Sequence, residues 1–316
     1  TGGTFTYDGT AHGATVTVGA LPEGYTLEVA ASSATAMNVS DGEVAATADV
    51  LVIRNAQGED VTSRLNVKYV NGTIKVEPAK LTVTTPSVSK PYDGQALTAE
   101  GKVSGFVNGE AATLETTGSQ TTVGTSVNGY ELVWDDNAKA ENYTVEENLG
   151  TLEVTKSMAG IVVIPQGGTK VYDGMALESA GINVIGVPAS FTLSAKTKGS
   201  ITDAGYVTAE VDSYIITNAA GQDVTDQFGN VATGKASLVV TKRPVTLVSG
   251  DASKVYDGTA LTEQNVSVED GSLASGEEFG YDFFGFQTSV GSSKNTFAAK
   301  PGNGATKVEN YDITYR

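Results

Sequence analysis

The residues of this chain that could do acid–base chemistry are aspartates in a recurring Tyr-Asp-Gly motif. General acid–base catalysis needs a second group positioned against the first, and four copies in the same local setting do not mark one such pair. An Asp-Gly pair instead favours a tight turn, in which glycine takes a positive φ, the aspartate bonds to nearby backbone and the tyrosine ring is buried alongside. We therefore predict a structural turn motif. It occurs at Tyr7-Asp8-Gly9, Tyr92-Asp93-Gly94, Tyr172-Asp173-Gly174 and Tyr256-Asp257-Gly258.

The composition excludes most other catalytic chemistry. The 316 residues contain no cysteine and one histidine, His12. This excludes thiol nucleophiles, Cys-ligated zinc and multi-histidine metal sites. Because the nucleophile–base arrangements of hydrolases use such partners, we predict that the chain is not an enzyme and has no catalytic, cofactor-binding or metal-binding residue.

Carboxylate chemistry is the remaining alternative, since the chain contains 37 Asp and Glu. Glycosidases use two carboxylates across a sugar, but no pair stands out, and the adjacent Asp135 and Asp136 are typical of a solvated surface. Asn55–Asp60 and Asn218–Asp223 offer oxygen ligands around a glycine. Their spacing differs from that of a calcium loop, so a turn is favoured, and calcium binding stays open.

Lysine and asparagine side chains raise the question of a covalent cross-link. Some surface modules of Gram-positive bacteria join Lys to Asn in an intramolecular amide, which needs a buried, uncharged lysine. A solvated lysine at a sheet edge, where it hinders strand pairing, is the favoured alternative. Repeat one has Phe5 in place of the lysine, so we predict no such bond. The residues concerned are Lys90, Lys170 and Lys254, each two positions before a motif, and Asn142 and Asn310.

The charge balance limits the possible partners. The chain carries 37 Asp and Glu against 20 Lys and Arg, a formal net charge of −17. Such a charge repels phosphate backbones and anionic membrane surfaces. The longest apolar run, around Ile161–Ile164, ends at Pro165 and is far shorter than a membrane span. We expect no nucleic-acid binding and no membrane insertion.

The Tyr-Asp-Gly motifs mark four internal repeats, spaced by 85, 80 and 84 residues (92−7, 172−92, 256−172). Ile53–Thr62 returns as Ile216–Thr225, so repeats one and three are one subtype. Glu141–Thr144 returns as Glu309–Asp312, so repeats two and four are the other. The order is A-B-A-B, which indicates a duplicated two-module unit.

Prolines just past two predicted strands, Pro78 and Pro244, help to place the module boundaries. We predict modules at 1–77 (type A), 78–156 (type B), 157–242 (type A) and 243–316 (type B). Repeat four stops at Tyr311–Arg316, whereas its sister continues through Gly150–Val154. We therefore expect the fourth module to lack its last strand and the chain to be cut from a longer one.

Period-two alternation predicts strands nearly throughout, for example at Ala14–Val18, Tyr25–Val29, Leu81–Thr84 and Leu149–Val154. Asn-Gly within Val70–Thr73 predicts a hairpin with a type I′ turn. The one helical hint is a single turn at Asp60–Ser63 and Asp223–Asp226. Short strands over about 80 residues favour an all-β fold of four tandem small, Ig-like β-sandwich modules. The alternative is a β-grasp-like module.

An aromatic run in repeat four is the one asymmetric feature. Phe279, Tyr281 and Phe283 alternate on one strand face and are expected in the core. Phe284 and Phe286 then point outward, toward a neighbouring module or the absent strand, or toward a ligand such as a glycan. Trp134, the sole Trp, is predicted in the core.

The repeats resemble the YDG and MBG families of tandem β-modules in large bacterial surface and adhesin-like proteins. The matching elements are Lys254–Thr262, Asp60–Thr62, Asn310–Tyr315 and Gly150–Val154. The resemblance implies secretion, repeated arrays and a stalk or adhesive role, and it brings no catalytic site with it.

Two functions follow as expectations. The first is the structural stalk region of a secreted or surface-anchored bacterial adhesin-like protein, extracellular and monomeric, whose parent protein contacts a host protein or glycan. The second is a module that itself binds a host protein or glycan through Phe284 and Phe286. The exposure of these two side chains discriminates between them.

Overall fold

The chain is all-β. The computed structural model describes residues 1–316 and contains strands and five short 3-10 turns, without an α-helix. It has no helix with the length and apolar character needed to cross a bilayer. The 3-10 turns are η1 (Val39–Asp41), η2 (Thr62–Arg64), η3 (Ala140–Asn142), η4 (Thr225–Gln227) and η5 (Val308–Asn310).

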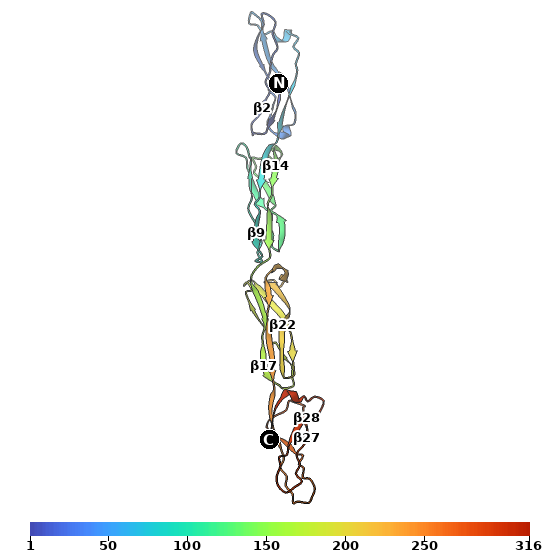
Figure 1. The fold of residues 1–316 in the computed structure, drawn as a ribbon. Coiled ribbons are helices and arrows are strands. Elements are labelled where there is room, and N and C mark those ends of the chain that lie inside the picture. Colours follow the sequence, from blue (N-terminus) through green and yellow to red (C-terminus); the bar gives the residue numbers. More distant parts are fainter. The chain divides into compact units, whose positions relative to one another are not determined.

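The chain divides into two compact units, Thr1–Thr155 (unit 1) and Lys156–Arg316 (unit 2). Figure 1 shows the strands of both units, coloured along the sequence. Every strand ladder lies inside one of four stretches, which we name segment I (1–77), segment II (78–156), segment III (157–242) and segment IV (243–316).

Unit 1 contains the strands of segments I and II. In segment I, β7 pairs with β1 and β5, β3 with β6, and β2 with β4. In segment II, β8 lies between β10 and β14, β15 lies between β9 and β12, and β11 pairs with β13. Segment I has β1 (Gly3–Thr6), β2 (His12–Gly13), β3 (Thr26–Ala31), β4 (Thr35–Ala36), β5 (Val44–Ala46), β6 (Val50–Arg54) and β7 (Gly72–Glu77). Segment II has β8 (Ala79–Thr84), β9 (Val88–Pro91), β10 (Lys102–Ser104), β11 (Ala112–Thr116), β12 (Gly124–Val127), β13 (Tyr130–Trp134), β14 (Tyr143–Asn148) and β15 (Thr151–Thr155).

Unit 2 contains the strands of segments III and IV. In segment III, β16 lies between β19 and β23, a second sheet has the order β17-β24-β22-β20, and β18 pairs with β21. In segment IV, β25 lies between β26 and β29, and β27 pairs with β28. Segment III has β16 (Ile161–Pro165), β17 (Gly168–Val171), β18 (Leu177–Glu178), β19 (Ile182–Ile185), β20 (Phe191–Lys198), β21 (Ser200–Ile201), β22 (Gly205–Asn218), β23 (Val231–Thr233) and β24 (Lys235–Thr241). Segment IV has β25 (Arg243–Ser249), β26 (Val266–Gly271), β27 (Phe279–Phe283), β28 (Phe297–Pro301) and β29 (Tyr311–Tyr315).

The last strand of segments I, II and III has the same place in each. It pairs in parallel with the strand that leads into the Tyr-Asp-Gly motif and antiparallel with a second strand. Its alternate apolar side chains are fully buried, as in Leu152 of β15 and Leu238 of β24. Segment IV has no strand in this place, and residues 251–257 and 292–296, which would flank it, form no strand either.

The core of each unit runs through the boundary between its two segments. In unit 1, Tyr7 and Ile74 of segment I pack in one cluster with Leu81 and Tyr143 of segment II. In unit 2, Val240 of segment III likewise packs in one hydrophobic cluster with buried residues of segment IV. Only one residue separates the consecutive strands at each boundary, Pro78 in unit 1 and Lys242 in unit 2. Such a short link beside a shared core joins the two segments tightly.

Two of the predicted elements are wrong. Ala14–Val18 is not a strand, since β2 ends at Gly13 and Thr15 is held only by an exchange of hydrogen bonds with Thr1. Val70–Thr73 is not a hairpin, because β7 begins at Gly72 and pairs with the distant β1 and β5. Gly72 has no positive φ, which a type I′ turn requires. A Cβ on Gly72 would lie 2.5 Å from the backbone nitrogen of Gly2, so close backbone approach explains the glycine.

Candidate functional site

The boundary between segments I and II is held by a carboxylate that binds two tyrosines. Glu110, in the loop before β11, accepts hydrogen bonds from the hydroxyls of Tyr7 in segment I and Tyr143 in segment II, the latter at 2.7 Å. The two rings meet edge to face, with centroids 5.6 Å apart. Burial raises the pKa of the Tyr143 phenol to about 12, and the bond to the carboxylate adds to the rise.

Unit 2 repeats this arrangement. Glu277 accepts hydrogen bonds from Tyr172 of segment III and, at 2.6 Å, from Tyr311 of segment IV. The centroids of these rings are 5.7 Å apart at 78°. Burial raises the pKa of Tyr172 to about 12 and also raises the pKa of Tyr311. We call each set of Tyr, Glu and Tyr a joint.

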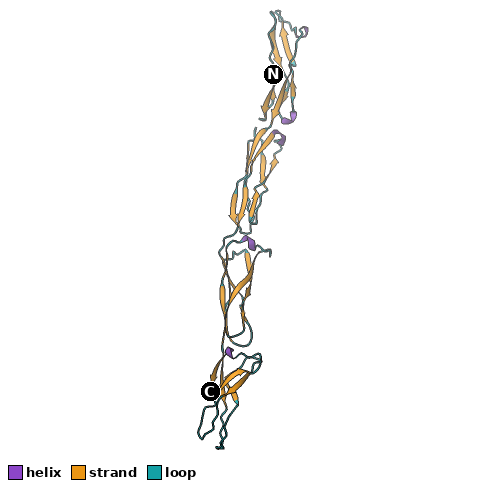
Figure 2. Ribbon diagram, turned by 45° about the vertical axis from the view of Figure 1, so that its right-hand side comes forward, coloured by secondary structure: helices purple, strands orange, loops and turns teal.

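A buried asparagine from a 3-10 turn completes each joint. In unit 1, Asn142 accepts a hydrogen bond from the Val39 N–H at 2.9 Å and donates one to the Asn38 side chain at 3.0 Å. These contacts hold η3 against η1, which are two of the helical turns drawn in Figure 2. In unit 2, Asn310 accepts from the Ala204 N–H at 2.7 Å and donates to Asp203 at 2.9 Å.

The sequence prediction missed the joints. It treated Asn142 and Asn310 as candidates for a cross-link and gave no role to Glu110 or Glu277. The sequence did contain one indication that the glutamates belong to the repeat. Their spacing (277−110) is nearly the same as that of the repeated Asn-Tyr pairs (310−142). A single glutamate in a loop carries no local pattern that identifies its partners.

The Tyr-Asp-Gly motif forms the same turn in all four segments. The aspartate accepts a hydrogen bond at 2.9 Å from the backbone N–H two residues later, and the glycine has φ between 76° and 82°. The rings of Tyr7, Tyr92 and Tyr172 are at most 5% exposed, whereas Tyr256 is 64% exposed. The aspartates thus act on the backbone of their own turns.

A lysine accompanies the aspartate in three of the four turns. Lys90, Lys170 and Lys254 lie 2.8, 2.6 and 2.9 Å from the aspartate three residues later. These lysines lower the pKa of Asp93, Asp173 and Asp257. They contact the turn, while Asn142 and Asn310 contact the joint, so the structure does not bring the two halves of a cross-link together.

Segment I, which has Phe5 in place of the lysine, uses its histidine instead. His12 Nε2 lies 3.1 Å from Asp8 Oδ1, and the Phe5 ring stacks on the imidazole with centroids 4.3 Å apart. The single histidine of the chain therefore supports a turn.

The two candidate calcium segments are also turns. Asn55 Oδ1 accepts the backbone N–H groups of Gln57 and Glu59, and Asn218 does the same with Ala220 and Gln222. The oxygens that the sequence offered as ligands bind their own backbone. No group of three or more His, Asp or Glu residues is arranged to hold a metal ion. Asp135 and Asp136 are exposed where β13 ends.

The aromatic run of segment IV is divided between core and surface. Phe279 is buried, and Tyr281 and Phe283 pack near Phe297 of β28. Phe284 and Phe286 are 64% and 65% exposed. Trp134 of segment II is half-buried and stacks on Tyr143 at 5.7 Å, so it belongs to the joint of unit 1.

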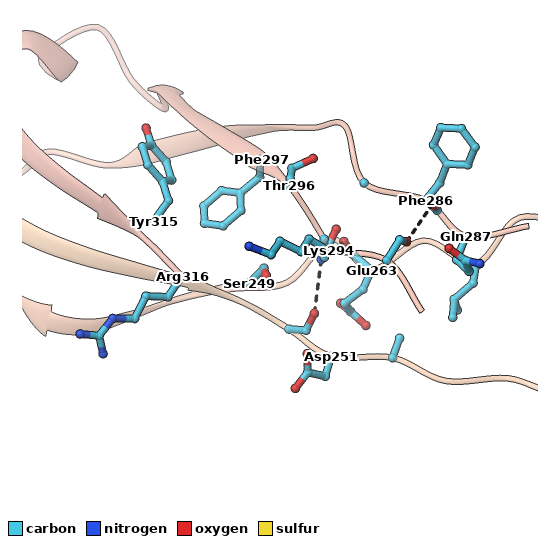
Figure 3. A pocket seen from close by; sticks show the side chains of 16 residues that line it. Ser249, Asp251, Glu263, Phe286, Gln287, Lys294, Thr296, Phe297, Tyr315 and Arg316 are labelled. Carbon is cyan, nitrogen blue, oxygen red and sulfur yellow. Dashed lines mark hydrogen bonds between the residues drawn. The ribbon is translucent and has the colours of Figure 1, made fainter. Parts of the chain in front are cut away.

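Phe286 lies at the rim of a groove in segment IV of about 530 Å³. Residues 249–252 and 293–296 line it, and Phe297 and Tyr315 line the end away from Phe286 (Figure 3). In segment II, the residues that correspond to 252 and 293–294 pair with β15. A second groove, of about 740 Å³, lies in segment I and is lined by residues 14–22 and 65–72 among others.

Comparison with known families identifies one part of the chain. A model described as "MBG domain (YGX type)" matches residues 81–153, most of segment II. Residues 81–153 form an MBG domain of the YGX type. MBG domains are tandem β-modules typical of bacterial surface proteins. The matched span reaches from β8 to β15, so this MBG domain includes Glu110 and Tyr143 of the joint.

No curated protein matches the chain. Among solved structures, it is similar to Drosophila N-cadherin EC1-4, with 9% identity, a TM-score of 0.20, and coverage of 89% of this chain and 86% of that one. It is similar to a SusE-like surface located polysaccharide binding protein from the Bacteroides thetaiotaomicron heparin utilisation locus (10% identity, TM-score 0.15, coverage 83% and 46%). It is also similar to the Bacillus anthracis TIE protein (9% identity, TM-score 0.16, coverage 86% and 58%). The chain thus spans about half the length of the last two proteins.

Proposed function

We propose that the chain is a structural stalk region of a secreted or surface-anchored bacterial adhesin-like protein. The observation that carries the proposal is the joint, which occurs in both units with the same residue types. An enzyme concentrates its distinctive residues in one site, whereas here the distinctive residues recur at the boundary between the two segments of each unit. The MBG domain at residues 81–153 supports a place at the bacterial surface.

The joint is suited to a stalk because it resists bending. A carboxylate that binds one hydroxyl from each side, next to a shared core and a one-residue link, must lose these contacts before the segments can tilt. Breaking such a set leaves a partly buried charge without partners, which is unfavourable. The net charge of −17 also keeps neighbouring copies apart.

In this proposal the four segments are four tandem small, Ig-like β-sandwich modules in A-B-A-B order, with the β-grasp-like module as the alternative. The chain is monomeric, has no enzymatic activity and binds neither nucleic acid nor membrane. Its contacts with a host protein or glycan are made through the parent protein.

The stalk function is tested by measuring how stiff the joint is. With spin labels on exposed positions of segments I and II in the full chain, we expect a narrow distance distribution that Glu110→Ala broadens. Glu115→Ala is the control, since Glu115 is exposed on β11 of the same segment. A broad distribution in the unmodified chain, or no broadening by Glu110→Ala, would contradict a stiff stalk.

The exposure of Phe284 and Phe286 favours a second candidate, a module that binds a host protein or glycan. Exposed aromatic rings next to a groove stack well on sugars and on apolar side chains. An array of glycans and matrix proteins tests this with the full chain and a variant carrying Phe284→Ser and Phe286→Ser. Binding by the full chain that the double variant loses would support this candidate, and a blank array would dismiss it.

A further inference from the structure

Glu110 of the unit 1 joint is placed by a tight turn that contains an Asn-Gly pair. The Glu110 N–H donates to the Val107 carbonyl at 3.0 Å, and Asn108 and Gly109 occupy the two central positions. Their φ values of 51° and 73° match a type I′ turn, and Asn108 is the one non-glycine residue of the chain with a positive φ. The position of Glu110 therefore depends on the main chain of this pair.

Asn108 also contacts segment I directly. Its side-chain amide donates a hydrogen bond to the Gly9 carbonyl at 3.3 Å. A Cβ at Gly9 would lie 2.4 Å from the Cβ of Asn108, so this side chain packs closely against the Tyr-Asp-Gly turn of segment I. The same turn holds Tyr7, which binds Glu110. A chemical change at Asn108 thus acts on both sides of the joint.

An asparagine followed by glycine can react with its own main chain, because no Cβ hinders the glycine nitrogen as it approaches the side-chain amide. The Gly109 nitrogen attacks Asn108 Cγ and forms a C–N bond, while Nδ2 leaves as ammonia with the proton of the Gly109 N–H. Water then opens this transient cyclic imide at either of its two carbonyl carbons. The products are aspartate and isoaspartate, and the mass rises by about 1 Da.

The chain has four Asn-Gly pairs, which begin at Asn71, Asn108, Asn128 and Asn303. Asn128 is fully buried, and its amide donates to two backbone carbonyls. The side chain of Asn303 makes three hydrogen bonds. Gly72, which follows Asn71, is held in the ladder of β5 and β7. These contacts restrain the approach of nitrogen to amide at three of the four pairs.

The pair at Asn108 has the fewest restraints. Asn108 and Gly109 are both exposed, and the side chain of Asn108 makes the single hydrogen bond to Gly9. The Gly109 N–H takes part in no backbone hydrogen bond. No atom lies within 4 Å of the position that a Cβ on Gly109 would take, so this peptide has room to rotate.

The joint of unit 2 is built without such a pair. Its Glu277 follows Ser275 and Gly276, and the Glu277 N–H donates to the Ala274 carbonyl at 3.1 Å. Ser275 has no positive φ and Gly276 has φ of 79°, which is the pattern of a type II turn. Serine has no amide that could leave as ammonia. The two joints therefore place the same glutamate with turns of different chemical reactivity.

We propose that Asn108 is a spontaneous modification site, and that its conversion to aspartate and isoaspartate weakens the joint of unit 1. A carboxylate has no N–H to donate to the Gly9 carbonyl and places a second acceptor against it. Isoaspartate also lengthens the main chain by one carbon atom inside the turn, which displaces Glu110 from Tyr7. The modification itself is independent of the stalk function, whereas its consequence for a stalk rests on that proposed function.

The site is tested by incubating the folded full chain at mildly alkaline pH and following each Asn-Gly pair by peptide mass spectrometry. Enzymatic methylation of isoaspartate provides a second readout. We expect Asn108 to convert about tenfold faster than Asn128 or more, because Asn128 must first leave the core. In urea the two rates should become similar, since both residues precede glycine. No conversion of Asn108 in the folded chain, or equal rates there, would overturn the assignment.

The effect on the joint is tested by urea unfolding before and after incubation. The control variant is Asn108→Ser, which copies the turn of unit 2 and keeps the other three Asn-Gly pairs. We expect incubation to lower the unfolding midpoint of the unmodified chain and to leave that of the variant nearly unchanged. Equal changes in the two chains would overturn the link between Asn108 and the joint.

A measurement without any variant gives the same information. Ion exchange separates converted from unconverted molecules of the incubated chain, because conversion adds one negative charge. Backbone hydrogen exchange at residues 107–111 should be faster in the converted fraction, and equal exchange in the two fractions would overturn the proposal. None of these results depends on how stiff the joint is in the fresh chain, so the stalk function is tested separately.

Discussion

The hydroxyl of Tyr7 donates a hydrogen bond to Glu110, which lies 103 positions further along the chain. Tyr172 and Glu277, 105 positions apart, make the same bond in unit 2. Each tyrosine also opens a Tyr-Asp-Gly turn, so one side chain is fixed by its own segment and binds the next one. A change that displaces the turn therefore also displaces the joint.

Removal of one hydroxyl from the joint should destabilise unit 1. Tyr143→Phe keeps the ring and its packing but deletes one of the two hydrogen bonds to Glu110. Because a hydrogen bond to a charged group contributes about 1.5–3 kcal/mol, we expect a loss of about 2 kcal/mol in the free energy of unfolding, measured with urea.

The control is Tyr130→Phe, which deletes a 2.6 Å hydrogen bond to Glu147 on the exposed surface of the same segment. Solvent screens that bond, so its loss should cost less. Equal losses from the two substitutions would mean that the joint contributes no more than a surface contact.

High pH should open the joints. The pKa values of Tyr143 and Tyr172 rise from 10.0 to about 12 on folding, so the folded state holds their protons more tightly than the unfolded state. The stability that these tyrosines contribute is full below pH 10 and is lost as the pH rises toward 12. Absorbance at the tyrosinate band should show a group of tyrosines that ionise late and together with the loss of structure. Titration of all 13 tyrosines near pH 10 would contradict this expectation.

A side chain at Gly258 should destabilise segment IV through the backbone alone. Gly258 has φ of 80°, and no atom lies within 4 Å of the position that a Cβ would take. Gly258→Val should therefore cost about 1–2 kcal/mol, the price of a left-handed conformation for a branched residue, measured by denaturant unfolding. Gly304→Val is the control in the same segment, since Gly304 also has open space but no positive φ. The turn argument fails if the two variants are equally stable.

The intact mass should equal the mass of the sequence. An amide between Lys and Asn eliminates ammonia, so each bond would lower the mass by about 17 Da. Lys90 contacts Asp93, whereas Asn142 contacts Val39 and Asn38, so the reacting groups have other partners. Mass spectrometry of the intact chain decides the question, and a deficit in multiples of that value would refute the prediction.

The strand errors show where local pattern is insufficient. Residues 14–18 alternate as a strand should, yet no strand forms there, although Thr15 exchanges two hydrogen bonds with the backbone of Thr1. A strand becomes regular only when its N–H and C=O groups find partners on another strand, and these partners are remote in sequence. The same reason explains why residues 252–255 form no strand while their counterparts in β9 do.

The sequence by itself determined the features that depend on near neighbours. The Tyr-Asp-Gly turns depend on an aspartate that reaches the N–H two residues later and on a glycine that tolerates positive φ, and both can be read locally. The repeat order follows from self-similarity alone. The tertiary structure decided the rest, because Glu110 meets Tyr7 and Asn142 meets Asn38 only after two segments have folded and packed together. Contacts between residues about 100 positions apart depend on three-dimensional packing, which no short window of sequence contains.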